Sequence, residues 1–266
     1  MKKQPPLNYI FGVAKIRALE RLLIKQEVFE EAVESGLGDA LKLFAESENY
    51  SDELLSVKDS AALEKILAIE ALKLKGLMRD LILDSELLGL LEVDAAGRLK
   101  DILLKYPSEF LEDYFMHVID LHNIKSFLRL YLLKEPQGKL DRALVCEGFI
   151  KKKDFLQLYG QDLALFLHKL EYVHKRQKII DYSYYLGAGI QKAAQEKSFA
   201  SLEKAINDFL AEALKPAKYL NFGPEPILAY YFAKANEINL IRIVILAKLN
   251  NVSTDLIKQR LNYAYA

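Results

Sequence analysis

The sequence is poor in cysteine, proline and glycine, and it contains no tryptophan. Its 266 residues include one cysteine, Cys146, with 7 prolines and 12 glycines. A single cysteine excludes an intrachain disulfide, which fits a reducing compartment. Scarce proline and glycine, together with abundant Leu, Ala, Lys and Glu, favour helices over strands and loops.

A surplus of charge of either sign is also absent, because 37 Lys and Arg residues balance 37 Asp and Glu residues. Proteins that bind nucleic acids usually carry a basic surplus to neutralise phosphates, so we predict no nucleic-acid partner. No apolar run approaches the roughly 20 residues that a bilayer-spanning helix needs. The most apolar stretch, Leu240 to Leu249, is interrupted by Arg242 and Lys248. We therefore expect no direct transmembrane insertion.

Patterns that mark catalytic, metal or cofactor sites are missing as well. No two histidines stand three or four residues apart, as two metal ligands on one helical face would. Gly187 and Gly189 begin like a dinucleotide-binding loop, but Lys192 occupies the place of the third glycine. We predict no catalytic residue, no metal and no cofactor, and hence a chain that is not an enzyme. An all-α enzyme with a scattered site remains an alternative.

A near-repeat links the middle of the chain to its C-terminal part. The segment from Tyr114 to Lys125 aligns with the segment from Tyr231 to Arg242. Each begins with a Tyr-Phe pair, has an acid six residues later and ends with a base. A repeated unit that cannot bury its apolar face alone packs on its copies, so the repeat predicts an assembled helical scaffold.

The remaining pattern predicts an all-α protein, because no useful length of chain alternates apolar and polar residues with the period of a strand. Ser108 and Pro226 have the residue types that begin helices. A short helix is expected around Cys146. We predict a single helical domain over residues 1–266, with internal breaks near 36–38, 135–138 and 216–226. The long helices are predicted at 9–35, 59–91, 108–134, 161–197 with a kink at 187–189, and 225–249.

The acid and the base of each repeat copy stand five residues apart, which places them about 140° apart around a helix. Asp120 and Lys125 therefore cannot pair as neighbours on one face, and neither can Glu237 and Arg242. We predict that these acids and bases pair between helices and so tie one repeat to the next. Arg242 lies in an apolar run, which predicts its burial; the alternative is that these charges point to solvent.

The chain resembles the C subunits of V/A-type (vacuolar/archaeal-type) rotary ATPases, a family that includes the d subunit of eukaryotic V-ATPases. The resemblance rests on a C-terminal motif from Gly223 to Lys248, on a middle copy from Asp120 to Arg129, and on an N-terminal stretch, Phe11 to Leu23. Leu240 intervenes where the family motif runs directly from asparagine to an aliphatic residue and arginine, and the chain is shorter than most members. The residues that match the motif, and that we expect to be structural, are Tyr114, Asp120, Asn123, Lys125, Arg129, Gly223, Glu225, Pro226, Tyr230, Glu237, Arg242 and Lys248.

The resemblance implies a funnel of three similar helical units around a pseudo-threefold axis. It implies a non-catalytic component of the central stalk, on the cytoplasmic face of the membrane. This component would be a socket that joins the D–F rotor shaft to the membrane rotor ring of proteolipids. It would transmit torque for proton or sodium ion transport. The alternative is a helical-repeat adaptor that binds a partner on a concave face.

Overall fold

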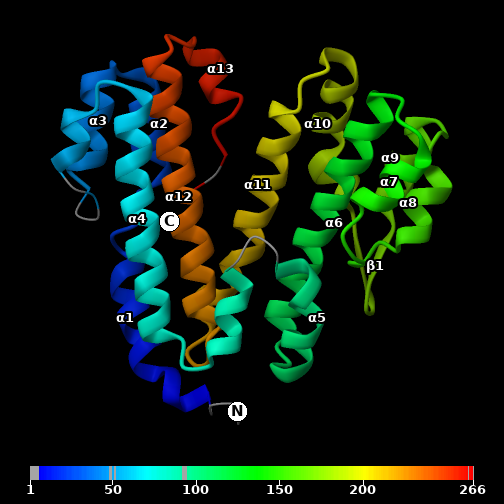
Figure 1. Cartoon of the computed structure of the whole chain (residues 1–266), viewed down its shortest axis with the longest axis horizontal. Helices are drawn as coiled ribbons and strands as arrows, with labels where there is room; N and C mark the ends of the chain where they lie inside the picture. The colour runs from blue at the N-terminus through cyan, green and yellow to red at the C-terminus, as the bar shows by residue number, and fades with distance from the viewer. Residues whose placement is uncertain (1–5, 48–49, 51, 92–94, 263, 266) are drawn as a thin grey trace. The chain divides into compact units, whose positions relative to one another are not determined.

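The computed structural model describes residues 6–47, 50, 52–91, 95–262 and 264–265. The chain divides into two compact units (Figure 1). Unit 1 combines the two ends of the chain, Met1–Leu88 and Ala211–Ala266, and unit 2 is formed by Gly89–Leu210. The predicted helical character is confirmed, with one exception in unit 2 that is described below.

Unit 1 is organised around α12, the long helix Glu225–Leu249. α12 packs against α1, α2, α3 and α4, and runs beside α4 in Figure 1. Thirteen residues of α12 are buried, which explains its apolar sequence. The other elements are η1 (Pro6–Tyr9), α1 (Ile10–Glu20), α2 (Gln26–Glu34), α3 (Leu37–Ala45), η2 (Asp52–Ser56), α4 (Ser60–Leu81), η4 (Lys215–Tyr219) and α13 (Thr254–Lys258).

Unit 2 is organised around α6, the long helix Glu109–Leu132. Its core is aromatic: the rings of Phe127 and Phe166 stack with centroids 4.0 Å apart, and Phe155 lies against both. The predicted start of α6 is confirmed, because the Ser108 side chain accepts a hydrogen bond from the Leu111 amide. The other elements are α5 (Ala95–Lys105), α7 (Gln137–Ala143), α8 (Lys152–Leu158), α9 (Leu163–Glu171), β1 (Val173–Lys175), β2 (Lys178–Ile180) and α10 (Tyr182–Glu196). Two elements, η3 (Ser85–Leu91) and α11 (Ala200–Leu214), contain the points where the chain passes between the units.

Three predicted helices are wrong in their extent. The helix expected over 9–35 is interrupted after α1, because residues 21–25 leave the helical path and bury Leu23 and Ile24. The helix expected over 59–91 ends at Leu81 and is followed by η3. Cys146 lies beyond the end of α7, in the loop before α8, and not in a helix.

The helix expected over 161–197 is also wrong, because an antiparallel hairpin of β1 and β2 separates α9 from α10. The expected kink at 187–189 does not interrupt α10. Gly189 instead allows a close approach of helices: a Cβ atom there would lie 2.9 Å from the Cα atom of Leu202 in α11.

Candidate functional site

The acid of the middle repeat copy, Asp120, is fully buried in α6. Its carboxylate accepts hydrogen bonds from the backbone amides of Phe149 and Ile150, both at 3.1 Å. It also accepts a hydrogen bond from the Tyr182 hydroxyl at 3.1 Å. Asp120 therefore fastens both the loop after α7 and the start of α10 to the middle of α6.

Burial dominates the electrostatics of Asp120. Removal from water raises the pKa of Asp120 to about 7, although the three hydrogen bonds favour the ionised form. His117 lies on the same helix, and its Nδ1 atom is 2.6 Å from the Tyr182 oxygen. Burial lowers the pKa of His117 to about 4, so this imidazole is neutral at pH 7. Since Tyr182 donates its proton to Asp120, its oxygen can accept from the Nδ1–H of His117.

The loop that donates to Asp120 is held at two further points. A Cβ atom on Gly148 would lie 2.3 Å from the Asp120 Oδ1 atom and 2.7 Å from the Met116 carbonyl, so only glycine fits there. The buried Asn123 side chain donates to the Cys146 carbonyl at 2.8 Å and accepts from the Val145 amide at 3.2 Å. Asp120 and Asn123 thus replace the secondary-structure hydrogen bonds that this loop lacks.

The acid of the C-terminal copy, Glu237, is buried in α12 in a similar way. Its carboxylate accepts from the Ile24 backbone amide at 2.6 Å and from the Tyr50 hydroxyl at 2.9 Å. It also pairs with the ammonium group of Lys234 at 2.5 Å, and this ammonium lies 4.0 Å from the centre of the Tyr50 ring. The chain between α1 and α2 leaves the helical path at the point where Ile24 donates its N–H group to Glu237.

The two centres share one construction. In each, a buried acid in the central helix accepts from a backbone amide of another segment and from a tyrosine hydroxyl. The residue three positions before the acid, His117 or Lys234, joins the same cluster. The aligned bases bind glutamates of neighbouring helices: Lys125 lies 3.5 Å from Glu203 of α11.

Arg242 contacts Glu64 of α4 through its Nε atom, at 2.9 and 3.1 Å from the two carboxylate oxygens. The prediction of pairing between helices is therefore confirmed for the two bases and wrong for the two acids. Each base pairs within its own unit, so neither pair ties one repeat copy to the other. Among the described residues, Asp120 accepts from amides and a hydroxyl, and Glu237 takes its base from its own helix. Burial of Arg242 is also wrong, since its side chain is 33% exposed.

The other motif residues of unit 1 lie at the two ends of α12. Gly223 has φ +86°, in the region that favours glycine, and its amide donates to the Pro6 carbonyl at 3.2 Å. Pro226 occupies the first turn of α12, as predicted. Lys248 donates to the carbonyls of Val33 and Ser35, and so caps the end of α2. Glu225 is half-buried in the first turn, and Tyr230 is buried one turn later.

In unit 2, Tyr114 is buried near the start of α6 and its ring meets that of Phe115 edge to face. Arg129 is exposed, with its guanidinium 5.6 Å from the centre of the Phe199 ring. The twelve motif residues are thus divided: five belong to unit 2 and seven to unit 1, and each centre is complete within its own unit.

Sequence reasoning found the two acids and missed most of their donors. Tyr50 and Tyr182 carry no local pattern that separates them from the other tyrosines, which number 15 in all. Lys234 had a signal, because it occupies the repeat position of His117. Glycine is common at the ends of helices, so the sequence suggests only that role for Gly148. The structure shows its contact with Asp120.

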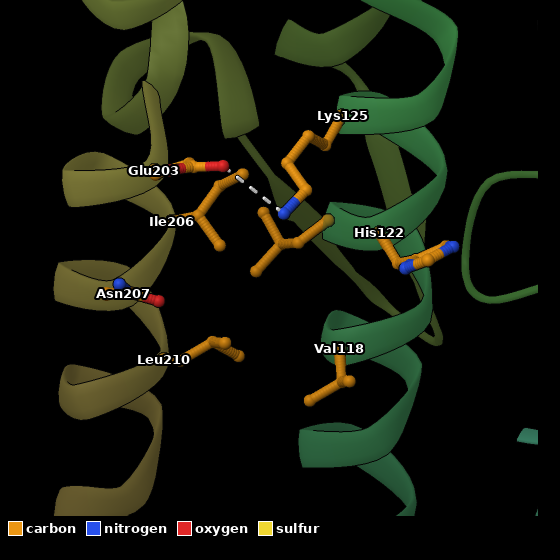
Figure 2. A pocket seen from close by; sticks show the side chains of 8 residues that line it. Val118, His122, Lys125, Glu203, Ile206, Asn207 and Leu210 are labelled. Atoms are coloured by element: carbon orange, nitrogen blue, oxygen red, sulfur yellow. Dashed lines mark ion pairs between the residues drawn. The ribbon is translucent and has the colours of Figure 1, made fainter. Parts of the chain in front are cut away.

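A cleft of about 340 Å³ opens in unit 2 between α6 and α11 (Figure 2). Apolar side chains of Val118, Ile206 and Leu210 point into it, and the Lys125–Glu203 ion pair crosses one end. His122 and Asn207 are its remaining polar groups. None of the described residues that line the cleft is a serine, a threonine or a cysteine.

Neither a metal cluster nor a membrane-spanning helix is found in the part of the chain that the structure describes. No group of three or more His, Cys, Asp and Glu side chains there could hold a metal ion. None of the described helices combines the length and the apolar character needed to cross a bilayer. The described geometry is that of two internally braced helical units.

The comparison with known families covers both copies of the near-repeat. The family model of the ATP synthase (C/AC39) subunit matches residues 94–260. The chain belongs to this family. The match includes the middle repeat copy with Asp120 and the C-terminal copy with Glu237.

A curated relative of this C/AC39 family member is the C subunit of the V-type sodium ATPase of Enterococcus hirae. It is 30% identical over 162 residues, which cover 61% of the chain and 46% of the relative. The chain therefore matches about half the length of this relative. No solved structure matches the chain.

Proposed function

We propose that the chain is a non-catalytic component of the central stalk of a V/A-type rotary ATPase. In this role it is a socket between the D–F shaft and the membrane rotor ring, on the cytoplasmic face of the membrane, and it passes torque between them for proton or sodium ion transport. The observation that carries the proposal is the family match over residues 94–260, together with the similarity to the C subunit of a V-type sodium ATPase. The arrangement of three units in a funnel stays a prediction.

The internal bracing of each unit supports a mechanical role. A body that transmits torque must resist the sliding of its helices against one another, and close packing provides this stiffness. Asp120 and Glu237 add directional hydrogen bonds between the central helix of each unit and segments far away in the sequence. Sliding or rotation of α6 or α12 would break these bonds and leave buried polar groups unpaired.

Binding to purified partners tests the proposal. The whole chain is incubated with an immobilised D–F shaft and, separately, with a detergent-solubilised rotor ring, with an unrelated helical protein as control. We expect the chain to be retained by both partners and the control by neither. If the folded chain were retained by neither shaft nor ring, the rotor role would be wrong and the helical-repeat adaptor would be the better interpretation.

A further inference from the structure

The outer face of the first helical segment is apolar, and the described part of the chain leaves it exposed. Leu7 is 62% exposed, Ile10 is 49% exposed and Phe11 is 76% exposed. Their spacing of three and four residues places them on one side of η1 and α1. Ala14 and Ala18 are exposed and continue this side toward the end of α1. We name these five residues the apolar stripe.

The stripe is not the face by which α1 joins unit 1. The opposite side of the segment carries Tyr9, Val13 and Ile16, which are all buried. Gly12 lies against the side chain of Ile227 in α12, where a Cβ atom would be only 2.8 Å from the Ile227 Cδ1 atom. α1 is therefore fixed to the core by one face while its other face is also apolar, which is the composition of a helix buried on both sides.

Further exposed aromatic side chains belong to the segment that is bound to this helix. The Arg17 guanidinium donates to the carbonyls of Ala217 and Leu220, both at 2.7 Å. In this segment Tyr219 is 84% exposed and Phe222 is 52% exposed. Tyrosine and phenylalanine are side chains that bind well at the boundary between lipid and water.

The charges beside the stripe are basic. Lys15 is exposed one turn after Phe11, and Arg21 is exposed one turn after Ala18. The one acid between Pro6 and Arg21 is Glu20, whose carboxylate is bound by Arg17 at 2.6 Å. An apolar face with cations at its margin complements a surface that has anionic groups above an apolar layer.

We infer that the apolar stripe binds the surface of an anionic lipid bilayer, with α1 lying in the interfacial plane. η1 has 4 residues and α1 has 11, and both together are shorter than the roughly 20 residues that span a bilayer. The segment therefore lies on the membrane and does not cross it. The lysine and arginine contact lipid phosphates while Leu7, Ile10 and Phe11 enter the headgroup boundary. This contact goes beyond the rotor role, which requires only protein partners.

Vesicle sedimentation of the whole chain tests the inference. The probes are vesicles of phosphatidylcholine, alone and mixed with phosphatidylglycerol. We expect the chain to sediment with the mixed vesicles, and we expect added salt to weaken this binding. Phe11→Ser should reduce the partition coefficient about tenfold, and Lys15→Gln about fivefold on mixed vesicles only. Leu72→Ser is the matched control, because Leu72 is 68% exposed on α4 and lies outside the stripe. It should bind like the parent.

Several results would overturn the inference. One is failure of the unmodified chain to sediment with mixed vesicles, and another is binding of Phe11→Ser, folded by circular dichroism, to the same extent as the parent. Binding only to vesicles that carry the rotor ring would assign the stripe to a protein partner and would also contradict the lipid contact. Retention of Phe11→Ser by the D–F shaft separates the two proposals. A parent chain that binds lipid but neither shaft nor ring would contradict the rotor role alone.

Discussion

At the scale of single residues, the two buried carboxylates are stabilised in different ways. Glu237 is neutralised by the ammonium of Lys234 at 2.5 Å, within its own helix. Asp120 has the neutral His117 at the equivalent position, and burial raises its pKa to about 7. Replacing either acid leaves buried amide and hydroxyl donors without an acceptor, so both acids should be far more sensitive to substitution than the exposed charges around them.

Removing an acid should cost more than removing a base of the same repeat copy. Glu237→Ala leaves the Lys234 ammonium, the Tyr50 hydroxyl and the Ile24 amide without an acceptor, and should lower the free energy of unfolding by roughly 3–5 kcal/mol. Arg242→Ala breaks a partly exposed pair with Glu64 and should cost about 1 kcal/mol or less. Urea unfolding of both variants measures the difference. Equal losses of stability would contradict the distinction between the buried acid Glu237 and the partly exposed base Arg242.

Two glycine substitutions should have effects of opposite sign. Gly148→Ala forces a methyl group against the Asp120 carboxylate and the Met116 carbonyl, and should destabilise the chain by about 1–3 kcal/mol. Gly76→Ala is the matched control, since Gly76 lies inside α4 with open space around its Cβ position. It should stabilise the chain by up to about 1 kcal/mol. Thermal melts of the two variants compare them directly, and a neutral Gly148→Ala would show that the loop can move away from Asp120.

The raised pKa of Asp120 predicts a pH dependence of stability. Because the pKa of Asp120 is about 7 in the folded chain and near 4 when unfolded, the folded state holds this proton more tightly. The resulting stabilisation is present below about pH 4 and is lost as the pH rises through 7. His117 has the opposite effect between about pH 4 and 6.5, since burial lowers its pKa to about 4.

Comparison of the parent with Asp120→Asn isolates the contribution of Asp120 from that of His117. Relative to this variant, the parent should lose a few kcal/mol of stability between pH 4 and 7, at about 1.4 kcal/mol for each unit of pKa shift. Urea unfolding at a series of pH values provides the measurement. A difference that stays constant with pH would mean that Asp120 keeps an ordinary pKa.

At the scale of elements, the sequence predicts long helices with local start signals and misses changes of direction that distant residues impose. Ser108 and Pro226 correctly predict the starts of α6 and α12. The interruption between α1 and α2 contains neither proline nor glycine. Its cause includes the acceptor at Glu237, 213 positions from Ile24. The donors of the centres are equally remote, with Tyr50 187 positions from Glu237 and Tyr182 62 positions from Asp120. The sequence predicts the acids because each lies in one continuous segment whose pattern recurs in the other repeat copy.

The hairpin escaped sequence analysis because its strands have three residues each, too few to show a period of two. It is held to the first turn of α6 by charge. Arg176, at the turn, pairs with Glu109 and with Glu112, and Lys175 pairs with Asp113 at 2.6 Å. These acids also stabilise the positive end of the α6 dipole.

Loss of the Arg176 charge should loosen the hairpin and leave the rest of unit 2 intact. Arg176→Gln removes the pairs with Glu109 and Glu112. Amide hydrogen exchange at residues 173–180 should become about two- to fivefold faster, and high salt should have a similar effect on the parent. Lys178→Gln on the second strand, which is exposed, is the control. Unchanged exchange in Arg176→Gln would show that backbone pairing alone holds the hairpin.

At the scale of the whole molecule, the chain has two units, each braced by its own buried acid. The donors to Glu237 all lie in unit 1, and those to Asp120 all lie in unit 2. The near-repeat therefore marks two separate clusters, each with a buried acid that accepts hydrogen bonds from its own unit. It does not mark one shared site.

Hydrogen exchange should show this division directly. Glu237→Gln should speed amide exchange at buried positions of residues 6–88 and 211–262, and Asp120→Asn should do so at residues 95–210. Each variant should leave the other range close to the parent, because neither acid shares a partner with the other unit. Faster exchange across both ranges in either variant would show that the two units open together.

The order of the units along the chain has a consequence for synthesis on the ribosome. Unit 1 needs α12, which packs against α1 to α4, yet α12 emerges more than a hundred residues after α4. Unit 2 is continuous, so all of its parts are available as soon as residue 210 has left the ribosome. The faces of α1 to α4 that pack on α12 therefore lack this partner until α12 has been synthesised, whereas unit 2 can fold before that point. A nascent chain stalled before Glu225 would be the form that most needs protection by a chaperone.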